Sequence, residues 1–471
     1  MSARTVVHIQ ESLDGTSTSF SLDSPKSYPK AGKSLPLSSR PGDSPFRDLE
    51  NGDGSPNQVM QAGQKLLEDL SAHPAVGPAI DQALQQTQGG CSPIHLWMHD
   101  VTTAEQLPWE AVYLKSKGEF LALDDRWPIA RVREANEADP RLVYEFEPPL
   151  RITAVLSAAG DDAQTQAPAA PQWQALYAAI RRGLAAPGAT PVALTVLVGE
   201  ENLRNQIESL GMAWIKCGYI TDRDGLLQAI RDSRPHILHF FCHGTSDEIP
   251  YLQIGSFTDW EAGRAGTIPI TAVELRQRAD PKQGIWLVTL NCCESATQAR
   301  DGRGLASSLV AAGFPAALGM RERIDVGLAH KVCDSFYPAI LELINQAAPG
   351  GPTSDIEWAQ ALSNVRASLA GGGPSGLPPQ QAARDCKTWT IPALYTRREP
   401  FMLKRIASQA LAPPGLSEAK KRQIDYIQEL QRQRTKAAED YKDLPPEALR
   451  AILADFDGQL EKATVRLTQT N

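Results

Sequence analysis

Two apolar stretches, HILHFFCHG at residues 236–244 and IWLVTLNCCES at residues 285–295, decide how this sequence is expected to fold. Each begins with a nearly continuous apolar run of strand length, which is typical of a strand buried on both faces in a parallel sheet. Each run ends in residues that can do chemistry, His243-Gly244 in the first and Cys292-Cys293 in the second. The two runs therefore predict parallel strands whose carboxyl ends carry a histidine and a cysteine.

Strands and helices alternate around these two stretches, mainly from about residue 149 onward. Short apolar segments of strand type are separated by segments whose apolar residues have helical spacing. This alternation predicts an α/β fold, a three-layer α/β/α sandwich around a mostly parallel sheet, and not a barrel, because the strands are few. The expected strands are 94–98, 150–156, 192–198, 236–242, 285–290, 315–318 and 389–395, and helical spacing is found over 58–85, 173–184, 203–210, 226–230, 304–312 and 326–344.

The bulk composition indicates a globular chain of several domain-sized units. A length of 471 residues allows about two to four such units. A net charge of −8 argues against direct nucleic-acid binding, which usually goes with a basic excess. No apolar run approaches the ~18 residues of a membrane span, and the first residues lack the apolar core of a signal peptide. The seven cysteines then predict reduced thiols and a cytoplasmic location.

The two strand ends have the parts of an acyl-transfer site. The carboxyl ends of parallel strands lie at one edge of a sheet, so His243 and the cysteine pair are expected to meet there. A thiol attacks as its thiolate and needs a base such as an imidazole. Gly244 can offer its N–H to a developing oxyanion, and the reacting cysteine can offer a second N–H. The separation of 50 residues between His243 and Cys293 matches the offset of about fifty found in caspases.

Other interpretations of these residues stay open at this level. A histidine or cysteine at a strand end is often structural, and His236 and His239 inside the strand are expected to be core or supporting groups. Strand alternation places Cys292 and Cys293 on opposite faces, so one of them should be buried, but it does not say which. A metal site built from His239, His243 and both cysteines is conceivable, although no paired ligand spacing supports it.

At these residues the sequence resembles the CHAT family of caspase-like and separase-like cysteine peptidases of clan CD. In that family one apolar strand ends in His-Gly and a later one ends in a segment like Leu-Ser-Ala-Cys-Glu-Thr, to which residues 290–295 (LNCCES) correspond. Further matches are Leu107–Glu110, which resembles the family's Pro-Trp-Glu segment, the following Arg131, and residues 304–320 (GLASSLVAAGFPAALGM). The resemblance covers roughly residues 60–400.

The resemblance implies Cys293 as the nucleophile and His243 as its base, and Cys292 is then a packed core thiol. It implies peptide-bond cleavage through a thioester acyl-enzyme, without metal or organic cofactor, on a dedicated protein substrate in bacterial signalling or defence. Two segments depart from the family pattern. Asn291-Cys292 replaces the commoner Ser-Ala, and residues 320–323 (MRER) replace a tryptophan-containing segment, which leaves substrate preference open. Because the sequence shows no tetratricopeptide array, control is expected from the C-terminal helices or from a separate activating protein.

Composition shifts and the resemblance together predict four parts of the chain. Residues 1–57 are expected to form an N-terminal hairpin and an irregular linker, and residues 58–148 a degenerate, pseudo-caspase α/β subdomain. The caspase-like peptidase domain is expected over residues 149–400. Residues 415–471 contain two helical stretches broken at Pro445-Pro446, which predicts a C-terminal helical hairpin that docks on the main body or a partner, or only stabilises the fold.

Substrate specificity has three acidic candidates. Asp247 and Asp325 could line a pocket for a basic substrate side chain through charge pairing, or they could be solvated loop carboxylates. Glu294 directly follows the expected nucleophile and could bind substrate or orient the loop 294–303. For the whole chain, the competing hypothesis is a catalytically silent scaffold that uses the same fold to bind a partner protein. A nucleotide-binding domain is disfavoured because no glycine-rich phosphate loop follows the first strand.

Overall fold

The structure is a computed structural model that describes most of the chain up to residue 406 and single short stretches after it. The described residues are 4–12, 16–51, 56–85, 90–99, 103–136, 143–160, 168–186, 188–245, 249–279, 284–292, 304–347, 350–371 and 377–406, with 430, 433–434, 436, 438, 453–454 and 456–459. The chain divides into two compact units, residues 1–406 and 407–471. In the second unit the described residues are helical, and Arg434 pairs with Asp457 at 2.7 Å. The predicted C-terminal hairpin otherwise lies outside the described residues.

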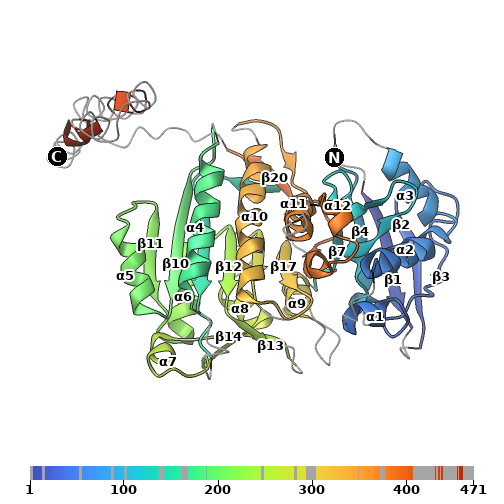
Figure 1. Ribbon diagram of the computed structural model, residues 1–471, viewed down its shortest axis with the longest axis horizontal. Coiled ribbons are helices and arrows are strands. Elements are labelled where there is room, and N and C mark those ends of the chain that lie inside the picture. The colour runs from blue at the N-terminus through green and yellow to red at the C-terminus, as the bar shows by residue number, and fades with distance from the viewer. Residues whose placement is uncertain are drawn as a thin grey trace. The chain divides into compact units, whose positions relative to one another are not determined.

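A large sheet forms the centre of the first unit, with twelve strands among the residues that the structure describes (Figure 1). Their order across the sheet is β11, β10, β9, β12, β16, β17, β19, β7, β4, β1, β2 and β3. The bounds are β1 Thr5–Glu11, β2 Thr18–Ser24, β3 Leu35–Pro36, β4 Ile94–His99, β7 Ile129–Val132, β9 Leu150–Leu156, β10 Val192–Val198, β11 Ile215–Tyr219, β12 Ile237–Phe241, β16 Leu287–Leu290, β17 Ala316–Met320 and β19 Pro392–Thr396.

Ten of these twelve strands form two blocks of parallel strands that run in opposite directions, and β2 and β3 continue the sheet beyond β1 in antiparallel pairs. Strands β11, β10, β9, β12, β16 and β17 form one block, and β19, β7, β4 and β1 form the other. The blocks meet at a seam where β17 pairs antiparallel with β19. The predicted mostly parallel α/β fold is therefore confirmed. Because direction reverses at the seam, the carboxyl ends of the two blocks lie at opposite edges of the sheet.

Helices cover both faces of the sheet and give the three predicted layers. On one face α4, α10 and α11 pack in a buried cluster called here the α10-side core, and on the other α6, α8 and α9 pack in the α9-side core. Figure 1 shows α4 and α10 side by side in front of the sheet.

Among the described residues, no helix is long and apolar enough to cross a bilayer. The bounds are α1 Phe46–Asn51, α2 Gln58–Ser71, α3 Val76–Gln85, α4 Ala170–Leu184, α5 Glu201–Ser209, α6 Arg223–Ser233, α7 Phe257–Glu261, α8 Ala272–Arg278, α9 Leu305–Ala311, α10 Val326–Asn345, α11 Trp358–Gly371 and α12 Pro379–Ala382.

Side chains along β12 alternate between the two cores, as the pleat of a strand requires. Ile237 and Phe241 lie in the α10-side core, whereas Leu238 and Phe240 lie in the α9-side core. The neighbouring strand β16 alternates in the same way. Both faces of these two strands are therefore buried, which explains why their sequences are apolar without a polar alternation.

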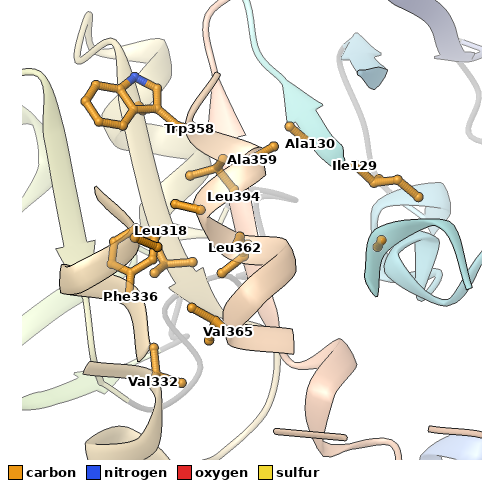
Figure 2. Packing of buried hydrophobic residues seen from close by; sticks show 14 of the residues in the cluster. Ile129, Ala130, Leu318, Val332, Phe336, Trp358, Ala359, Leu362, Val365 and Leu394 are labelled. Atoms are coloured by element: carbon orange, nitrogen blue, oxygen red, sulfur yellow. The ribbon is translucent and has the colours of Figure 1, made fainter. Parts of the chain in front are cut away.

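Helix α11 joins the two blocks across the seam. In Figure 2, Leu362 and Val365 of this helix lie beside Leu318 of β17 and Leu394 of β19, and Ala130 of β7 lies nearby. All five side chains belong to the α10-side core and are almost completely buried. One continuous core thus crosses the seam, so the N-terminal block extends the sheet beyond the few strands that the sequence predicts. The predicted boundaries at residues 57, 148 and 400 stay a prediction.

Three small sheets complete the described part of the first unit. Strands β13 (His243–Thr245), β14 (Tyr251–Ile254) and β15 (Ile268–Thr271) pair antiparallel in that order. The others contain β18 (Ser354–Asp355), β20 (Met402–Arg405) and β8 (Val143–Phe146), and β5 (Tyr113–Leu114) with β6 (Glu119–Phe120). The first strand of the first of these sheets, β13, begins one residue after the end of β12.

Candidate active site

The candidate site lies where β12 and β16 end side by side. The two strands are parallel and pair from Ile237 with Leu287 to Phe240 with Leu290. The pairing continues one step further, because the N–H of Asn291 donates to the carbonyl of Phe240 at 2.9 Å. Both strands belong to the same block, so their carboxyl ends lie at one edge of the sheet, as predicted.

His243 and Gly244 follow β12 after a single residue, Cys242, and open the edge strand β13. His243 pairs with Gln253 and Gly244 with Leu252 in the antiparallel ladder with β14. Both residues are half-buried, whereas Cys242 is buried in the α9-side core. The histidine and the glycine are thus held by a short ladder at the edge where the sheet strands end.

The structure describes the cysteine pair only in part. Cys292 is 2% exposed and packs in the α9-side core, together with Leu290 two residues before it. Cys293, Glu294 and Asp247 lie outside the described residues. No disulfide joins the described cysteines. Of the predicted site residues, the structure therefore places His243, Gly244 and Asp325.

Asp325 is the N-cap of α10. Its side-chain oxygen Oδ1 accepts a hydrogen bond from the N–H of Leu328 at 2.7 Å, and the residue is exposed. A carboxylate at this position satisfies a backbone donor of the first turn and complements the positive end of the helix. Asp325 therefore has a clear structural role as a helix cap.

The two histidines inside the first stretch are core groups, as predicted. His239 is 1% exposed, with Nδ1 2.8 Å from Thr289 Oγ1 and Nε2 3.2 Å from Gln172 Nε2. His236 stacks on Trp286 at 4.2 Å between ring centroids. Burial lowers the pKa of each to about 3, and for His236 the nearby Arg151 adds to the effect. Both imidazoles are therefore neutral near pH 7.

The geometry argues against the metal site considered for His239, His243 and the cysteine pair. His239 faces Thr289 and Gln172 on the α10 side of the sheet, while Cys292 packs on the opposite face. Ligands of one metal ion must converge within about 2.3 Å of it, and side chains on opposite faces cannot do so. These two residues are therefore assigned to the two cores.

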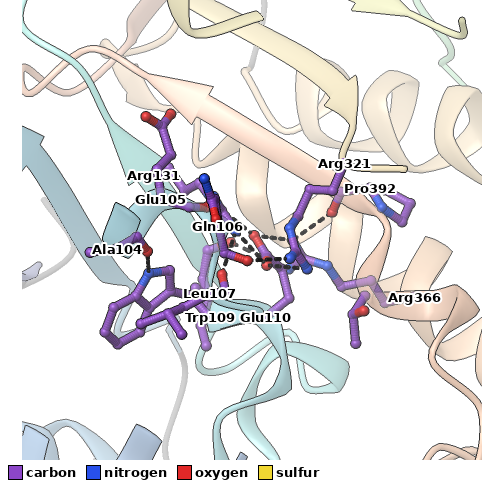
Figure 3. Close-up of polar contacts among 12 residues, drawn as sticks. Ala104, Glu105, Gln106, Leu107, Trp109, Glu110, Arg131, Arg321, Arg366 and Pro392 are labelled. Atoms are coloured by element: carbon purple, nitrogen blue, oxygen red, sulfur yellow. Dashed lines mark hydrogen bonds and ion pairs between the residues drawn. The ribbon is translucent and has the colours of Figure 1, made fainter. Parts of the chain in front are cut away.

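The Pro-Trp-Glu segment and Arg131 form a buried ion cluster near the seam (Figure 3). Glu110 accepts two hydrogen bonds from Arg131, from Nε at 3.0 Å and from Nη2 at 2.9 Å. Arg131 Nη2 also donates to the carbonyl of Leu107, and Trp109 Nε1 donates to the carbonyl of Ala104 at 2.8 Å. These bonds link the Pro-Trp-Glu segment to Arg131 of β7.

Two further arginines face the same carboxylate, and the sequence analysis missed them. Arg321 and Arg366 lie 3.9 Å and 4.0 Å from Glu110 oxygens. Arg366 also donates to the carbonyls of Ile129 and Pro392. Burial raises the pKa of Glu110, but the arginines outweigh burial and hold that pKa below its ordinary value. Arg321 belongs to the MRER segment that departs from the family pattern, whereas no sequence signal indicated Arg366.

Comparisons with known proteins give one family match and several solved structures. A family model described as CHAT domain matches residues 61–372, more than half of the chain. The complex of Porphyromonas gingivalis RgpB pro- and mature domains is 9% identical, with a TM-score of 0.40 over 75% of this chain and 76% of that chain. The Saccharomyces cerevisiae separase–securin complex is 10% identical, with a TM-score of 0.30 over 67% of this chain and 16% of that chain. No curated protein matches.

Proposed function

The chain belongs to the CHAT domain family, and on that premise we propose that it is a cysteine endopeptidase in which Cys293 is the nucleophile and His243 the general base. The family resembles caspases and separases, which cleave peptide bonds with a cysteine and a histidine. The proposal assigns the same two roles to the two residues that follow β12 and β16 at one edge of the sheet.

The observation that carries this proposal is the register between β12 and β16. Their paired residues differ by 50 in number throughout, from Ile237 with Leu287 to Phe240 with Leu290. His243 and Cys293 differ by the same 50, and each comes three positions after the last pair. Because the offset is the same and both strands end at the same edge of the sheet, we infer that the side chains of His243 and Cys293 lie close together.

The burial of Cys292 supports the choice of Cys293. Cys292 packs in the α9-side core, and the side chain of Asn291 before it bonds to α10 on the other face. If this alternation continues for one residue, the next side chain turns away from the α9-side core. A buried thiol is shielded from substrate, so Cys292 is a poor nucleophile and Cys293 is the better candidate.

In the proposed reaction His243 takes the proton of the Cys293 thiol, and the thiolate attacks the carbonyl carbon of the scissile peptide bond. The N–H groups of Gly244 and Cys293 stabilise the negative oxygen that forms. The C–N bond breaks as His243 gives the proton to the leaving amine, and a thioester on Cys293 remains. Water then loses a proton to His243 and attacks the thioester, and release of the acid returns the proton to the thiol.

The substrate in this proposal is a dedicated protein with a basic residue before the cleaved bond. Asp325 supports this preference, because it is exposed and its Oδ2 accepts no hydrogen bond from the residues that the structure describes. Asp247 and Glu294 are proposed on their sequence positions alone. An activating protein, a role in bacterial signalling or defence, and a cytoplasmic location complete the proposal and follow from the family resemblance and the composition.

A peptidyl chloromethyl ketone tests the proposal against the alternative of a silent scaffold. The reagent alkylates a cysteine much faster when a peptidase site binds it and activates the thiol. We expect mass spectrometry to find the adduct on Cys293 in the wild type and in Cys292→Ala. In His243→Ala the labelling rate should fall about 100-fold or more, since a general base contributes 10²–10⁴. Absence of labelling, even in a cell extract that supplies an activator, would support the scaffold.

A further inference from the structure

The end of β16 is fastened to the first turns of α10 by the side chain of Asn291. Its Nδ2 donates to the carbonyl of Ala329 at 2.7 Å, and its backbone N–H donates to Phe240 at 2.9 Å. The side chain is almost completely buried, at 3% exposure. Asn291 therefore ties together a helix and two strands at a point two residues before Cys293.

The same part of α10 also lies against the end of β12. The rings of Phe241 and His330 have centroids 6.5 Å apart, and His330 directly follows Ala329. The helix begins four residues before Ala329, at its cap Asp325. The first turns of α10 thus contact the ends of both strands that precede the proposed catalytic pair.

The amide of Asn291 is held at one end only. Its Oδ1 is buried and finds no donor among the residues that the structure describes, so the Nδ2 bond alone orients the side chain. A change of that nitrogen to oxygen would keep the shape of the side chain. It would also remove the donor and place a second acceptor against the carbonyl of Ala329. The contact can therefore be broken without a change in side-chain volume.

We propose that Asn291 is a positioning residue for Cys293, which holds the end of β16 on α10 so that the thiol meets the base. This inference rests on the proposed function. It differs from a purely structural role in one respect: loss of the bond should change the reactivity of Cys293 at temperatures where the protein is fully folded. A positioned thiol near an imidazole has a lowered pKa, and a misplaced thiol returns toward about 8.5.

Asn345 supplies a matched control at the opposite end of the same helix. Its Oδ1 accepts a hydrogen bond from the N–H of Thr190 at 2.8 Å, so it too fastens α10 to a neighbouring segment by a side-chain amide. Asn345 lies at the last residue of α10, a full helix length away from Asp325. Asn345→Ala should lower stability to a similar extent and leave the proposed site untouched.

The experiment measures the rate of alkylation of Cys293 by iodoacetamide from pH 5 to pH 10. Mass spectrometry separates Cys293 from Cys292, and the melting temperature of each variant fixes a temperature below unfolding. We expect Asn291→Asp and Asn291→Ala to alkylate Cys293 at least tenfold more slowly at pH 7, with the midpoint of the pH profile shifted upward. Asn291→Ser keeps a shorter donor, so its alkylation rate at Cys293 should lie between those of the other two variants and the wild type. This variant replaces them if they do not fold. Asn345→Ala should match the wild type.

Two results would overturn the inference, and they are distinguishable. If alkylation of Cys293 depends on His243 but the Asn291 variants match Asn345→Ala, Asn291 is structural and the proposed function stands. If His243→Ala leaves the rate and the pH profile of Cys293 unchanged in otherwise wild-type protein, the proposed function fails and this inference fails with it.

Discussion

At the scale of single residues, Glu110 is a charged side chain that lies buried among arginines. It is 1% exposed and faces three arginines, of which Arg131 and Arg366 are completely buried. A buried ion pair costs desolvation energy on both sides, and the loss of one partner leaves uncompensated charge in the interior. Here the loss of a single carboxylate would leave three guanidinium groups without their shared counter-ion.

Substitution Glu110→Gln is therefore expected to destabilise the first unit by about 3–5 kcal/mol, because it keeps the shape of the side chain and removes its charge. The free energy of unfolding, measured by urea titration, checks this. Glu145→Gln is the control, since Glu145 pairs with Lys404 at 3.3 Å on the surface, where both side chains are about half exposed. The control should change stability by less than about 1 kcal/mol. Similar losses in the two variants would contradict this account of the cluster.

The sequence predicts side chains well where a local rule decides them. Strand alternation predicts that one cysteine of the pair is buried, and Cys292 is the one that the structure places in a core. The apolar surroundings of His236 and His239 predict core groups, and both are buried. Arg366 shows the limit, because its contact with Glu110 joins residues 256 positions apart in sequence and leaves no local pattern. The placement of Cys293 stays a prediction.

At the scale of elements, α10 links the candidate site to the rest of the fold. Asp325 caps its first turn, Asn291 is bonded to Ala329 within that region, and the helix then runs for twenty residues along α4 and α11. The cap and the proposed specificity role of Asp325 make different demands on the same carboxylate. A cap needs an oxygen acceptor, whereas a pocket for a basic side chain needs negative charge.

Two substitutions separate these roles. Asp325→Asn keeps an acceptor at the N-cap, so we expect a stability change of only a few tenths of a kcal/mol, while Asp325→Ala should cost about 1 kcal/mol. If Asp325 also binds a basic substrate side chain, Asp325→Asn should slow labelling by a lysyl chloromethyl ketone about tenfold and leave a leucyl reagent unaffected. Equal labelling of Asp325→Asn and wild type by both reagents would restrict Asp325 to the cap.

Element positions follow from the sequence more readily than element directions. The predicted strands at 150–156 and 192–198 coincide with β9 and β10. The segment 58–85, predicted to be helical, forms two helices, α2 and α3. Pro74 follows α2 and disfavours helical backbone at the residue before it. At the start of α3, His73 Nδ1 accepts hydrogen bonds from the N–H groups of Ala75 and Val76. The closing strand is present as β19, but its antiparallel pairing with β17 depends on tertiary contacts that apolar patterning does not encode.

At the scale of the whole molecule, two of the buried histidines, His236 and His239, make stability depend on pH. His236 and His239 have pKa values of about 3 in the folded state, against about 6.5 in an unfolded chain. Between these values the unfolded state binds more protons than the folded state. The free energy of unfolding must therefore fall as pH decreases from about 6.5 toward 3, and the loss is absent above pH 7.

His236 and His239 are each expected to contribute a slope of about 1.4 kcal/mol per pH unit within this window. His239→Asn should reduce the acid slope of the free energy of unfolding by that amount, although it lowers stability at pH 7. Urea titrations at half-unit steps from pH 4 to pH 8 provide the measurement. Above pH 7 the variant and the wild type should have parallel profiles. An unchanged slope at pH 4–6 would show that His239 is not held neutral.

The order of the strands also has a consequence for solubility. An open sheet ends in two strands with unsatisfied backbone groups, and such margins can recruit further chains into aggregates. At one margin β3 has only two residues, of which Pro36 has no N–H to donate. At the other margin, β11 carries the exposed Lys216, whose charge disfavours pairing of this edge with a strand of another chain. Within the part of the chain that the structure describes, each end strand of the long sheet therefore carries a residue that hinders pairing with a further strand.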